Sequence, residues 1–512
     1  MTELLRTGTR PAQNSAQTQD PLVAAAMMLE EAENLRQAKK LQRSKQVCEQ
    51  LLEEYPDYVG ALHTLGFILA DMKEYEKSAS YLSKATMLCP RDWRILTGLS
   101  SVNLKLKRAD AAIENLEQAQ KIKPDDPSII GTLAEIYRNQ KEYELAADLY
   151  EKFIQKEPEL YKAKFSLGDC YEHLGDVEKA VELYESMIKE GQSARVATVH
   201  LAQLPINLTS IDVLSLLQKL EDSPEINEST LRFAQALNLH NAGKYEEAWE
   251  QLIKANEPKK HLLAEVWRSS LPRRDQILKF ARNIPLFKII PEPPKGQPVS
   301  LFILGPSRAG KTTLERLLSI VPSVKRGYEN PIVENAVRRT TQISGCITLS
   351  GINGMPSNLD KEFLRFYSEE LIQRAGGARV FTNTHPAKIV EVLRYAKAIP
   401  AVRFIFIKRN PEDLIMRTYM KSYESGNSYA YDIKTIKENM DWYYALSEIY
   451  SEKLPGISQI VYYEDMLKNP AAVLDAAGKL CGIDVKADAL PNIGNDQGIG
   501  GPYRKLIREA LG

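Results

Sequence analysis

The chain has 512 residues, with 67 lysines and arginines balanced by 67 aspartates and glutamates. This length predicts two or more domains, each with its own core. The balanced charge gives the chain no overall attraction to nucleic acid or to acidic membranes. The five cysteines are scattered, with no Cys-x-x-Cys pair and no histidine cluster, so we expect no metal site and no disulfide framework.

The first twenty residues, Met1 to Asp20, are polar and rich in Thr, Gln and Ala. They lack the apolar stretch of a secretion signal, and no later segment is long and apolar enough to span a membrane. We therefore expect residues 1–20 to be disordered. The chain as a whole is expected to be cytoplasmic, without membrane or nucleic-acid partners.

A repeat of 34 residues marks the next part of the chain, residues 21–191. Prolines recur at this spacing at Pro56, Pro90, Pro124 and Pro158. Two further positions of the same frame are always small: Ala32, Gly66, Ser100, Ala134 and Gly168 at one, and Ser44, Ser78, Ala112, Ala146 and Ala180 at the other. Small residues let two helices cross closely, and the period is that of the tetratricopeptide repeat. The sequence predicts an all-α tetratricopeptide-repeat solenoid.

Residues 192–288 are predicted to hold a degenerate unit and further helical repeats. The pattern blurs after Gly191 and returns in Leu231–Pro258, where Ala248 lies two periods after Ala180. Such a stack has a concave surface suited to a peptide or a partner protein. A Pro-rich linker is then expected over 289–297, because its prolines stop any helix.

The remaining residues, 298–512, are predicted to form one α/β domain. It opens with the apolar run Val299–Leu304, followed by Gly305-Pro-Ser-Arg-Ala-Gly310-Lys311-Thr312 and a helical pattern. This order of strand, glycine-rich loop and helix is that of a phosphate-binding P-loop. The loop predicts phosphate contacts from Ser307, Arg308, Ala309, Gly310, Lys311, Thr312 and Thr313.

The spacing of this loop also fits a Walker A loop, which would bind ATP with magnesium. A Walker protein needs a second strand that ends in an acid to hold the metal. The clearest later strand, Val402–Ile407, ends in Lys408 and Arg409, whereas Ile460–Asp465 does end in acid. An ATP-dependent kinase or ATPase therefore stays open as an alternative.

Four ordered motifs make the chain similar to the bacterial tetratricopeptide-repeat sulfotransferases, which use 3′-phosphoadenosine 5′-phosphosulfate (PAPS) and no metal. The resemblance covers nearly the whole chain. The motifs are Gly305–Glu315 for the 5′-phosphosulfate loop, Arg409-Asn-Pro-Glu-Asp413 with Arg417, Tyr463-Glu-Asp465, and Gln497–Arg504 as a donor-covering loop. The resemblance implies a P-loop domain with a central parallel sheet.

The resemblance also implies roles for single residues. Arg409 and Arg417 would hold the 3′-phosphate, Tyr463 would lie near the adenine, and Arg504 would belong to the covering loop. Independently of the resemblance, sulfuryl transfer needs a cation near the departing oxygen, for which Lys311 is the candidate, and a base that takes the proton of the acceptor hydroxyl. Either Glu329 or His385 could be that base, and Glu329 matches the bacterial type better. The acceptor would be a peptide, a protein or a saccharide.

The chain departs from the family pattern at five positions. Ala309 replaces a Ser, Lys311 a Thr, Arg417 a Ser, and Asn383-Thr384 stands where an Asp-Lys pair is usual. Lys311 could supply the cation that Thr384 lacks. These changes also leave open a repeat scaffold whose domain binds a nucleotide without catalysis.

Overall fold

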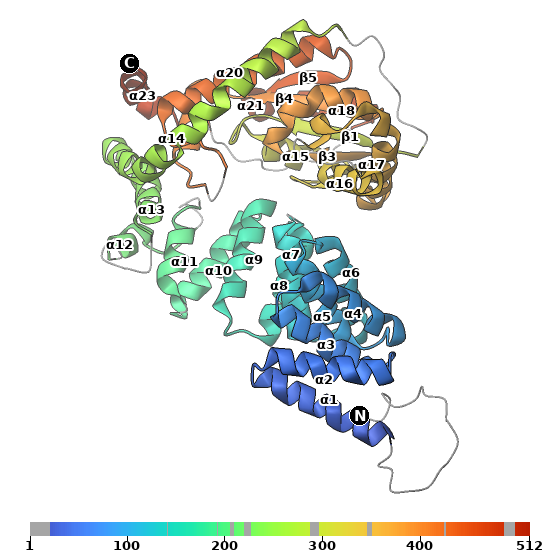
Figure 1. Ribbon diagram of the computed structural model, residues 1–512. Coiled ribbons are helices and arrows are strands. Elements are labelled where there is room, and N and C mark those ends of the chain that lie inside the picture. The colour runs from blue at the N-terminus through green and yellow to red at the C-terminus, as the bar shows by residue number, and fades with distance from the viewer. Residues whose placement is uncertain are drawn as a thin grey trace, which may run out of the picture. The chain divides into compact units, whose positions relative to one another are not determined.

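The computed structural model describes residues 21–140, 142–191, 193–204, 209–219, 227–286, 296–345, 351–423, 426–485 and 497–512. The chain divides into two compact units, residues 1–174 and 175–512, which are described separately (Figure 1). The segment expected to be disordered, 1–20, and residues 289–295 of the expected linker lie outside the described residues. The predicted domain limits at 191, 288 and 297 stay predictions.

The first unit is a stack of antiparallel helix pairs, as the repeat predicted. Its helices are α1 (Pro21–Gln37), α2 (Leu41–Glu54), α3 (Val59–Asp71), α4 (Tyr75–Leu88), α5 (Trp93–Lys105), α6 (Ala109–Ile122), α7 (Pro127–Asn139), α8 (Tyr143–Lys156) and α9 (Tyr161–Leu174). The second helix of each of the first four pairs ends two residues before the predicted proline. All ten small residues of the repeat frame are buried.

The small residues are required because the two helices of a pair touch there. The Ser78 hydroxyl donates to the Gly66 carbonyl oxygen at 2.6 Å, and the Ser44 hydroxyl makes the equivalent bond to Ala32 at 2.5 Å. A Cβ atom on Gly66 would lie only 2.6 Å from the Leu82 side chain. The turns between paired helices use the left-handed conformation at Lys39, Lys73 and Lys107, again 34 residues apart.

The second unit begins with further helices: α10 (Val177–Lys189), α11 (Ala194–Leu201), α12 (Val213–Gln218), α13 (Glu228–Asn241) and α14 (Tyr245–Asn283). Helices α13 and α14 form the hairpin that the returning repeat pattern predicted. Helix α14 continues through both Pro258, where the returning pattern ends, and Pro272. Packing against the α/β domain offsets the local cost of these prolines.

The α/β domain has a five-stranded, all-parallel sheet, which confirms the predicted fold class. Its strands are β1 (Val299–Leu304), β2 (Val324–Lys325), β3 (Val380–Asn383), β4 (Val402–Lys408) and β5 (Ser458–Tyr462), in the order β2-β3-β1-β4-β5. Every residue of β1, β3 and β4 is buried, as expected for the inner strands of a parallel sheet covered on both faces.

Helices cover both faces of the sheet. They are α15 (Lys311–Leu318), α16 (Ile332–Ser344), α17 (Asp360–Ala375), α18 (Val392–Ala398), α19 (Pro411–Tyr419), α20 (Ile433–Lys453), α21 (Tyr463–Lys468), α22 (Pro470–Cys481) and α23 (Arg504–Leu511). One apolar core contains residues of α16, α17, α18 and α20, and the other contains residues of α15, α21 and α22. None of the helices within the described ranges is long and apolar enough to cross a membrane.

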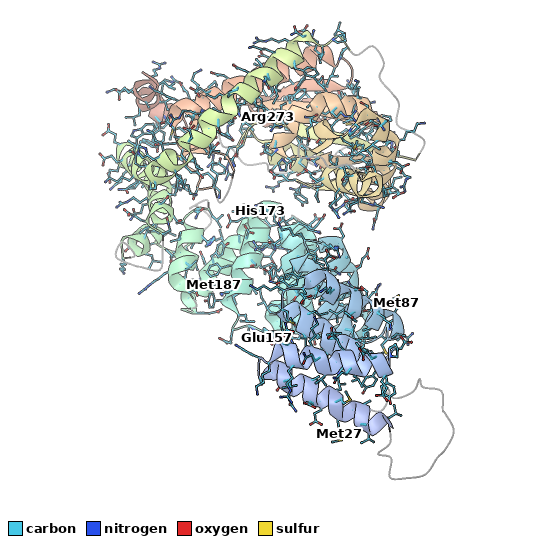
Figure 2. All side chains as sticks on the ribbon, in the orientation of Figure 1. Met27, Met87, Glu157, His173, Met187 and Arg273 are labelled. Carbon is cyan, nitrogen blue, oxygen red and sulfur yellow. The ribbon has the colours of Figure 1, made fainter. Side chains whose placement is uncertain are left out.

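Helix α14 lies along α20 (Figure 1). The Arg274 guanidinium is stacked between the rings of Trp267 and Trp442, at 4.5 and 3.9 Å from their centres, and it donates to Asn439 at 2.6 Å. Burial lowers the pKa of Arg274 to about 10. Figure 2 shows the side chains along this helix, with the neighbouring Arg273 labelled. Helix α14 of the hairpin is therefore packed against the α/β domain, and we call this contact the joint.

Candidate active site

The candidate site lies at the carboxyl edge of the sheet, where strand order changes direction. Strand β1 lies between β3 and β4, so the chain leaves β1 at the point where later strands are added on either side. Ligands of open parallel sheets bind at such a switch point. The segments that follow β1, β3 and β4 carry most of the predicted site residues.

The loop after β1 has two residues in the left-handed conformation, Arg308 (φ 67°) and Gly310 (φ 102°). A Cβ atom on Gly310 would lie 2.3 Å from the Tyr463 ring, so this position requires glycine for its conformation and for space. Helix α15 begins directly after it, at Lys311. Loop and helix amides at this position form a cradle for an anion.

Lys311 is buried beneath the loop, and its Nζ donates to the Pro306 carbonyl oxygen at 3.0 Å. Burial lowers the pKa of Lys311 to about 8; the positive charge of Arg308 adds to the lowering, and the Glu329 carboxylate opposes it. A buried ammonium group is costly unless an anion accompanies it. The predicted cation is thus held where a bound phosphate would compensate its charge.

The other predicted loop residues differ in their environment. The Ser307 hydroxyl lies 3.1 Å from the Tyr423 hydroxyl, while Arg308 and Thr312 are exposed and Thr313 is half-buried. Ala309 is fully buried, and its methyl group would lie 3.1 Å from a Cβ on Gly305. The alanine therefore fits inside the loop as a packing residue.

Glu329 lies on a turn that is fixed by a buried carboxylate, Glu315 of α15. Glu315 has no exposed surface and accepts hydrogen bonds from the Tyr328 amide at 3.0 Å and from the Thr382 hydroxyl. Its second oxygen is 3.6 Å from the Arg326 Nε, and burial raises its pKa. Sequence reasoning gave Glu315 no role, because burial cannot be read from one position of a motif.

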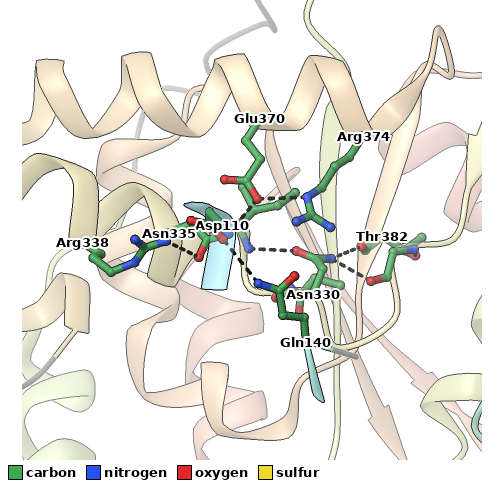
Figure 3. Close-up of polar contacts among 11 residues, drawn as sticks. Asp110, Gln140, Asn330, Asn335, Arg338, Glu370, Arg374 and Thr382 are labelled. Carbon is green, nitrogen blue, oxygen red and sulfur yellow. Dashed lines mark hydrogen bonds and ion pairs between the residues drawn. The ribbon is translucent and has the colours of Figure 1, made fainter. Parts of the chain in front are cut away.

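The same turn is tied to the end of β3. The Asn330 side-chain amide donates to the carbonyl oxygens of Gly327 and Thr382, both at 3.0 Å (Figure 3). A Cβ on Gly327 would lie 2.1 Å from the Thr382 carbonyl oxygen, and the Gly327 amide donates to the Thr382 hydroxyl at 2.9 Å. The Thr384 amide donates to the Tyr328 carbonyl oxygen at 2.8 Å. Glu329 therefore lies between residues that are held by hydrogen bonds. Its negative charge favours the charged form of Lys311 and opposes the lowering of the Lys311 pKa.

His385 follows β3 and begins the short helix η4 (Pro386–Glu391). Its Nδ1 accepts a hydrogen bond from the Ala387 amide at 3.2 Å. A neutral imidazole with Nδ1 as acceptor carries its proton on Nε2. The basic lone pair of His385 is thus engaged in capping the helix.

Arg409, at the end of β4, is 4% exposed. Its Nη1 donates to the Arg308 carbonyl oxygen at 3.1 Å, and its guanidinium lies 4.2 Å from the centre of the Tyr463 ring. The Tyr444 hydroxyl bonds both the amide and the carbonyl of Arg409, each at 2.9 Å. The structure therefore brings Arg409, Tyr463 and the loop together.

The remaining predicted groups lie on helix α19 or in the segment that contacts it. Asp413 is buried and accepts hydrogen bonds from the Gly498 and Gly500 amides, each at 2.8 Å. Arg504 pairs at the surface with Glu412 at 2.8 Å. Arg417 is half-buried on the same helix. Asp413 belongs to the motif Arg409-Asn-Pro-Glu-Asp413, but no local pattern predicts that it accepts amides of residues 498 and 500.

The alternative acidic candidate, Asp465, is exposed in the first turn of α21. It follows β5, which β4 separates from β1, and the two strands beside β1 end in Asn383 and Lys408. Over the described ranges of the chain, no group of His, Cys, Asp or Glu side chains could hold a metal ion.

The fold and site define a helical-repeat protein with a phosphate-binding α/β domain. Residues 298–487 match the model of the sulfotransferase family, and residues 59–92, 94–126 and 132–195 match tetratricopeptide-repeat models. The chain is thus a tetratricopeptide-repeat protein with a sulfotransferase-family domain, as the motifs suggested.

The chain is also similar to an uncharacterized protein of Aquifex aeolicus, at 23% identity over 56% of this chain, and it spans only 39% of that protein. Among solved structures, MamA is 23% identical (33% of this chain, 94% of MamA, TM-score 0.31). YrrB, described as a tetratricopeptide-repeat protein with an unusual peptide-binding site, is 19% identical (35% and 91%, TM-score 0.32). A repeat protein of Parabacteroides merdae is 13% identical (46% and 93%, TM-score 0.33).

Proposed function

We propose that the chain transfers a sulfuryl group from PAPS to a hydroxyl group of a peptide, protein or saccharide. The observation that carries this proposal is the convergence of Lys311, Arg409, Tyr463 and the Glu329 turn on one phosphate-binding loop. The site offers cations and amides for two phosphate groups of one nucleotide, together with a carboxylate base. The sulfotransferase-family match supports the same assignment.

Each residue has a distinct part in donor binding. The loop amides, Arg308, Thr312 and Thr313 would hold the 5′ side. Arg409 would hold the 3′-phosphate, with Tyr463 beneath its guanidinium and beside the base of the nucleotide. Arg417 and Arg504 lie on α19 and at the start of α23, where the covering segment meets that helix.

In the transfer, PAPS supplies the sulfuryl group. The acceptor oxygen forms a bond to sulfur as the bond from sulfur to the 5′-phosphate oxygen breaks, which leaves adenosine 3′,5′-bisphosphate and a sulfate ester. Glu329 takes the proton of the acceptor hydroxyl. The Lys311 ammonium stabilises the negative charge that develops on the phosphate oxygen.

We assign the base to Glu329 rather than to His385. The carboxylate lies in a turn anchored by Glu315, Asn330 and Thr384. The Nδ1 of His385 is engaged with the Ala387 amide. The repeats of the first unit would bind the acceptor or its carrier protein along their concave face.

The test is binding and transfer with the purified chain. Calorimetry against adenosine 3′,5′-bisphosphate and against ATP with magnesium should show that the bisphosphate binds more tightly. Transfer of labelled sulfate from PAPS to tyrosine peptides, simple phenols and saccharides should fall about 10²–10⁴-fold in Glu329→Gln. The control, His385→Asn, should stay within about threefold, because its amide oxygen can still accept from Ala387.

Tight binding of ATP alone, with turnover that requires magnesium and is lost in Asp465→Asn, would overturn the proposal in favour of a kinase or ATPase. Bisphosphate binding without transfer to any acceptor class would instead indicate a nucleotide-binding scaffold.

A further inference from the structure

The helical hairpin α13–α14 shares an apolar core with the last residues of the chain. The hairpin contributes Phe233, Ala236, Ala248, Leu252 and Ala255 to this core. Helix α19 contributes Ile415, Met416 and Tyr419, and the last segment contributes Tyr503 and Ile507. All of these side chains are buried. The repeat hairpin therefore supports the segment that resembles a donor-covering loop.

Tyr503 is the centre of this contact and has no exposed surface. Its hydroxyl lies 3.0 Å from the Nδ1 of His240, near the end of α13. The rings of His240, Tyr245 and Trp249 surround the Tyr503 ring, with centres 5.7, 5.6 and 6.1 Å away. A side chain of the repeat hairpin thus makes the polar contact of the buried tyrosine.

The other side of the same segment is held by α19. Asp413 accepts the amides of Gly498 and Gly500, and a Cβ on Gly500 would lie 2.3 Å from the backbone of Glu412. Glu412 also pairs with Arg504. The segment 498–504 therefore packs between the α13–α14 hairpin and helix α19.

His240 is also coupled to the donor-binding helix by charge. The positive charge of Arg417, which we assign to the 3′-phosphate, adds to burial in lowering the pKa of His240. A neutral imidazole can accept the hydrogen bond of the Tyr503 hydroxyl through Nδ1.

We infer that the last repeat hairpin is part of the donor site, and that His240 is a positioning residue that holds Tyr503 and thereby the segment 498–504 against α19. This inference rests on the proposed function, because it assigns that segment to the PAPS donor. It extends the proposal by giving a residue of the repeats a part in donor affinity.

The experiment compares the full-length wild type with His240→Leu, His240→Asn and Tyr503→Phe. The asparagine amide can replace Nδ1 as a hydrogen-bond partner, so it should rescue the loss seen with leucine. His261→Leu is the matched control, because His261 is a solvent-exposed histidine of α14 that pairs with Glu257. Calorimetry measures the affinity for adenosine 3′,5′-bisphosphate, and hydrogen exchange measures the opening of residues 498–511.

Loss of one buried hydrogen bond should weaken bisphosphate binding about 3- to 10-fold in His240→Leu and in Tyr503→Phe. The double variant His240→Leu/Tyr503→Phe should lose no more affinity for the bisphosphate than either single variant, because each substitution alone already removes the same hydrogen bond. Amides of 498–511 should exchange about fivefold faster in both, while those of β1 and β4 stay unchanged. With an acceptor in hand, the KM for PAPS should rise while kcat stays within twofold.

The two possible failures are distinguishable. If the wild type does not bind the bisphosphate, the proposed function fails and this inference fails with it. If the wild type binds, but His240→Leu keeps both the affinity and the exchange rates of the wild type, the proposed function stands and only the role of His240 is refuted. If His240→Leu does not fold, the same measurements on Tyr503→Phe, which removes a single oxygen atom, decide whether the hydrogen bond holds the segment.

Discussion

Raising the pH should weaken the binding of adenosine 3′,5′-bisphosphate, because Lys311 loses its proton in the free protein. Burial holds the pKa of this ammonium group at about 8, against its ordinary value of 10.5. A bound phosphate favours the charged lysine and raises its pKa again. Below pH 8 the lysine is already charged and binding needs no proton. Above pH 8 the protein must take up a proton in order to bind.

The size of the effect follows from the two pKa values. If the bound phosphate restores the ordinary value, affinity falls by up to tenfold for each pH unit above 8. At pH 10 the linkage gives a loss of about 70-fold relative to pH 7. The direction is fixed, because a group whose pKa is raised by the ligand always favours binding at the lower pH.

Calorimetry from pH 7 to pH 10, in buffers of different ionisation enthalpy, measures both the affinity and the proton uptake. Lys311→Met should bind weakly at every pH and show no dependence between pH 8 and pH 10. Lys325→Met is the matched control, since Lys325 is an exposed lysine of the same domain. Lys325→Met should show the same decrease of bisphosphate affinity with rising pH as the wild type.

Equal affinity of the wild type at pH 7 and pH 10 would refute the reasoning. The same pH dependence of affinity in Lys311→Met would also refute the reasoning, because the group that titrates would then be another residue.

Three further changes test the structure around this lysine. Gly310→Ala places a methyl group against the Tyr463 ring in a left-handed conformation, so calorimetry should show a loss of roughly 2–5 kcal/mol in stability and the loss of bisphosphate binding. Glu315→Ala removes the buried carboxylate that accepts from the Tyr328 amide and the Thr382 hydroxyl, and urea unfolding followed by circular dichroism should show a loss of about 2–4 kcal/mol. Residues 298–512 alone would expose the apolar face that α14 covers, so size-exclusion chromatography should find them aggregated, while 227–512 stays monodisperse.

Each of these has a contrary result. A Gly310→Ala protein with normal binding would mean that the loop is free to move away from the tyrosine. Loss of less than 1 kcal/mol in Glu315→Ala would mean that water replaces the carboxylate. A soluble, folded 298–512 fragment would mean that the joint is dispensable.

Much of the fold could be predicted because its signals are periodic or local. The 34-residue spacing of Pro56 to Pro158 predicted the helical pairs, since the small buried residues and the prolines that follow each second helix act within one repeat. The glycines of the phosphate loop predicted a strand, a turn and a helix in the right order. The continuation of α14 through Pro258 and Pro272 could not be predicted, because a local rule cannot include the packing that offsets prolines inside a helix.

The candidate site was less accessible to sequence reasoning, because its support comes from residues distant in the chain. Glu315 holds the Glu329 turn from another element, and Asp413 binds amides 85 and 87 residues further on. His240 contacts Tyr503 across 263 residues. No spacing rule connects such pairs. The residues predicted to touch the donor follow motifs, whereas those that position them depend on tertiary structure.

The joint between α14 and the α/β domain also gives the protein an intrinsic optical probe. Three of its four tryptophans, Trp249, Trp267 and Trp442, lie at this joint, and only Trp93 belongs to the first unit. A Trp93→Phe variant would emit from the joint alone. Its emission spectrum would shift to the red when the indoles become hydrated, so the loosening of the hairpin could be followed in real time without any added label.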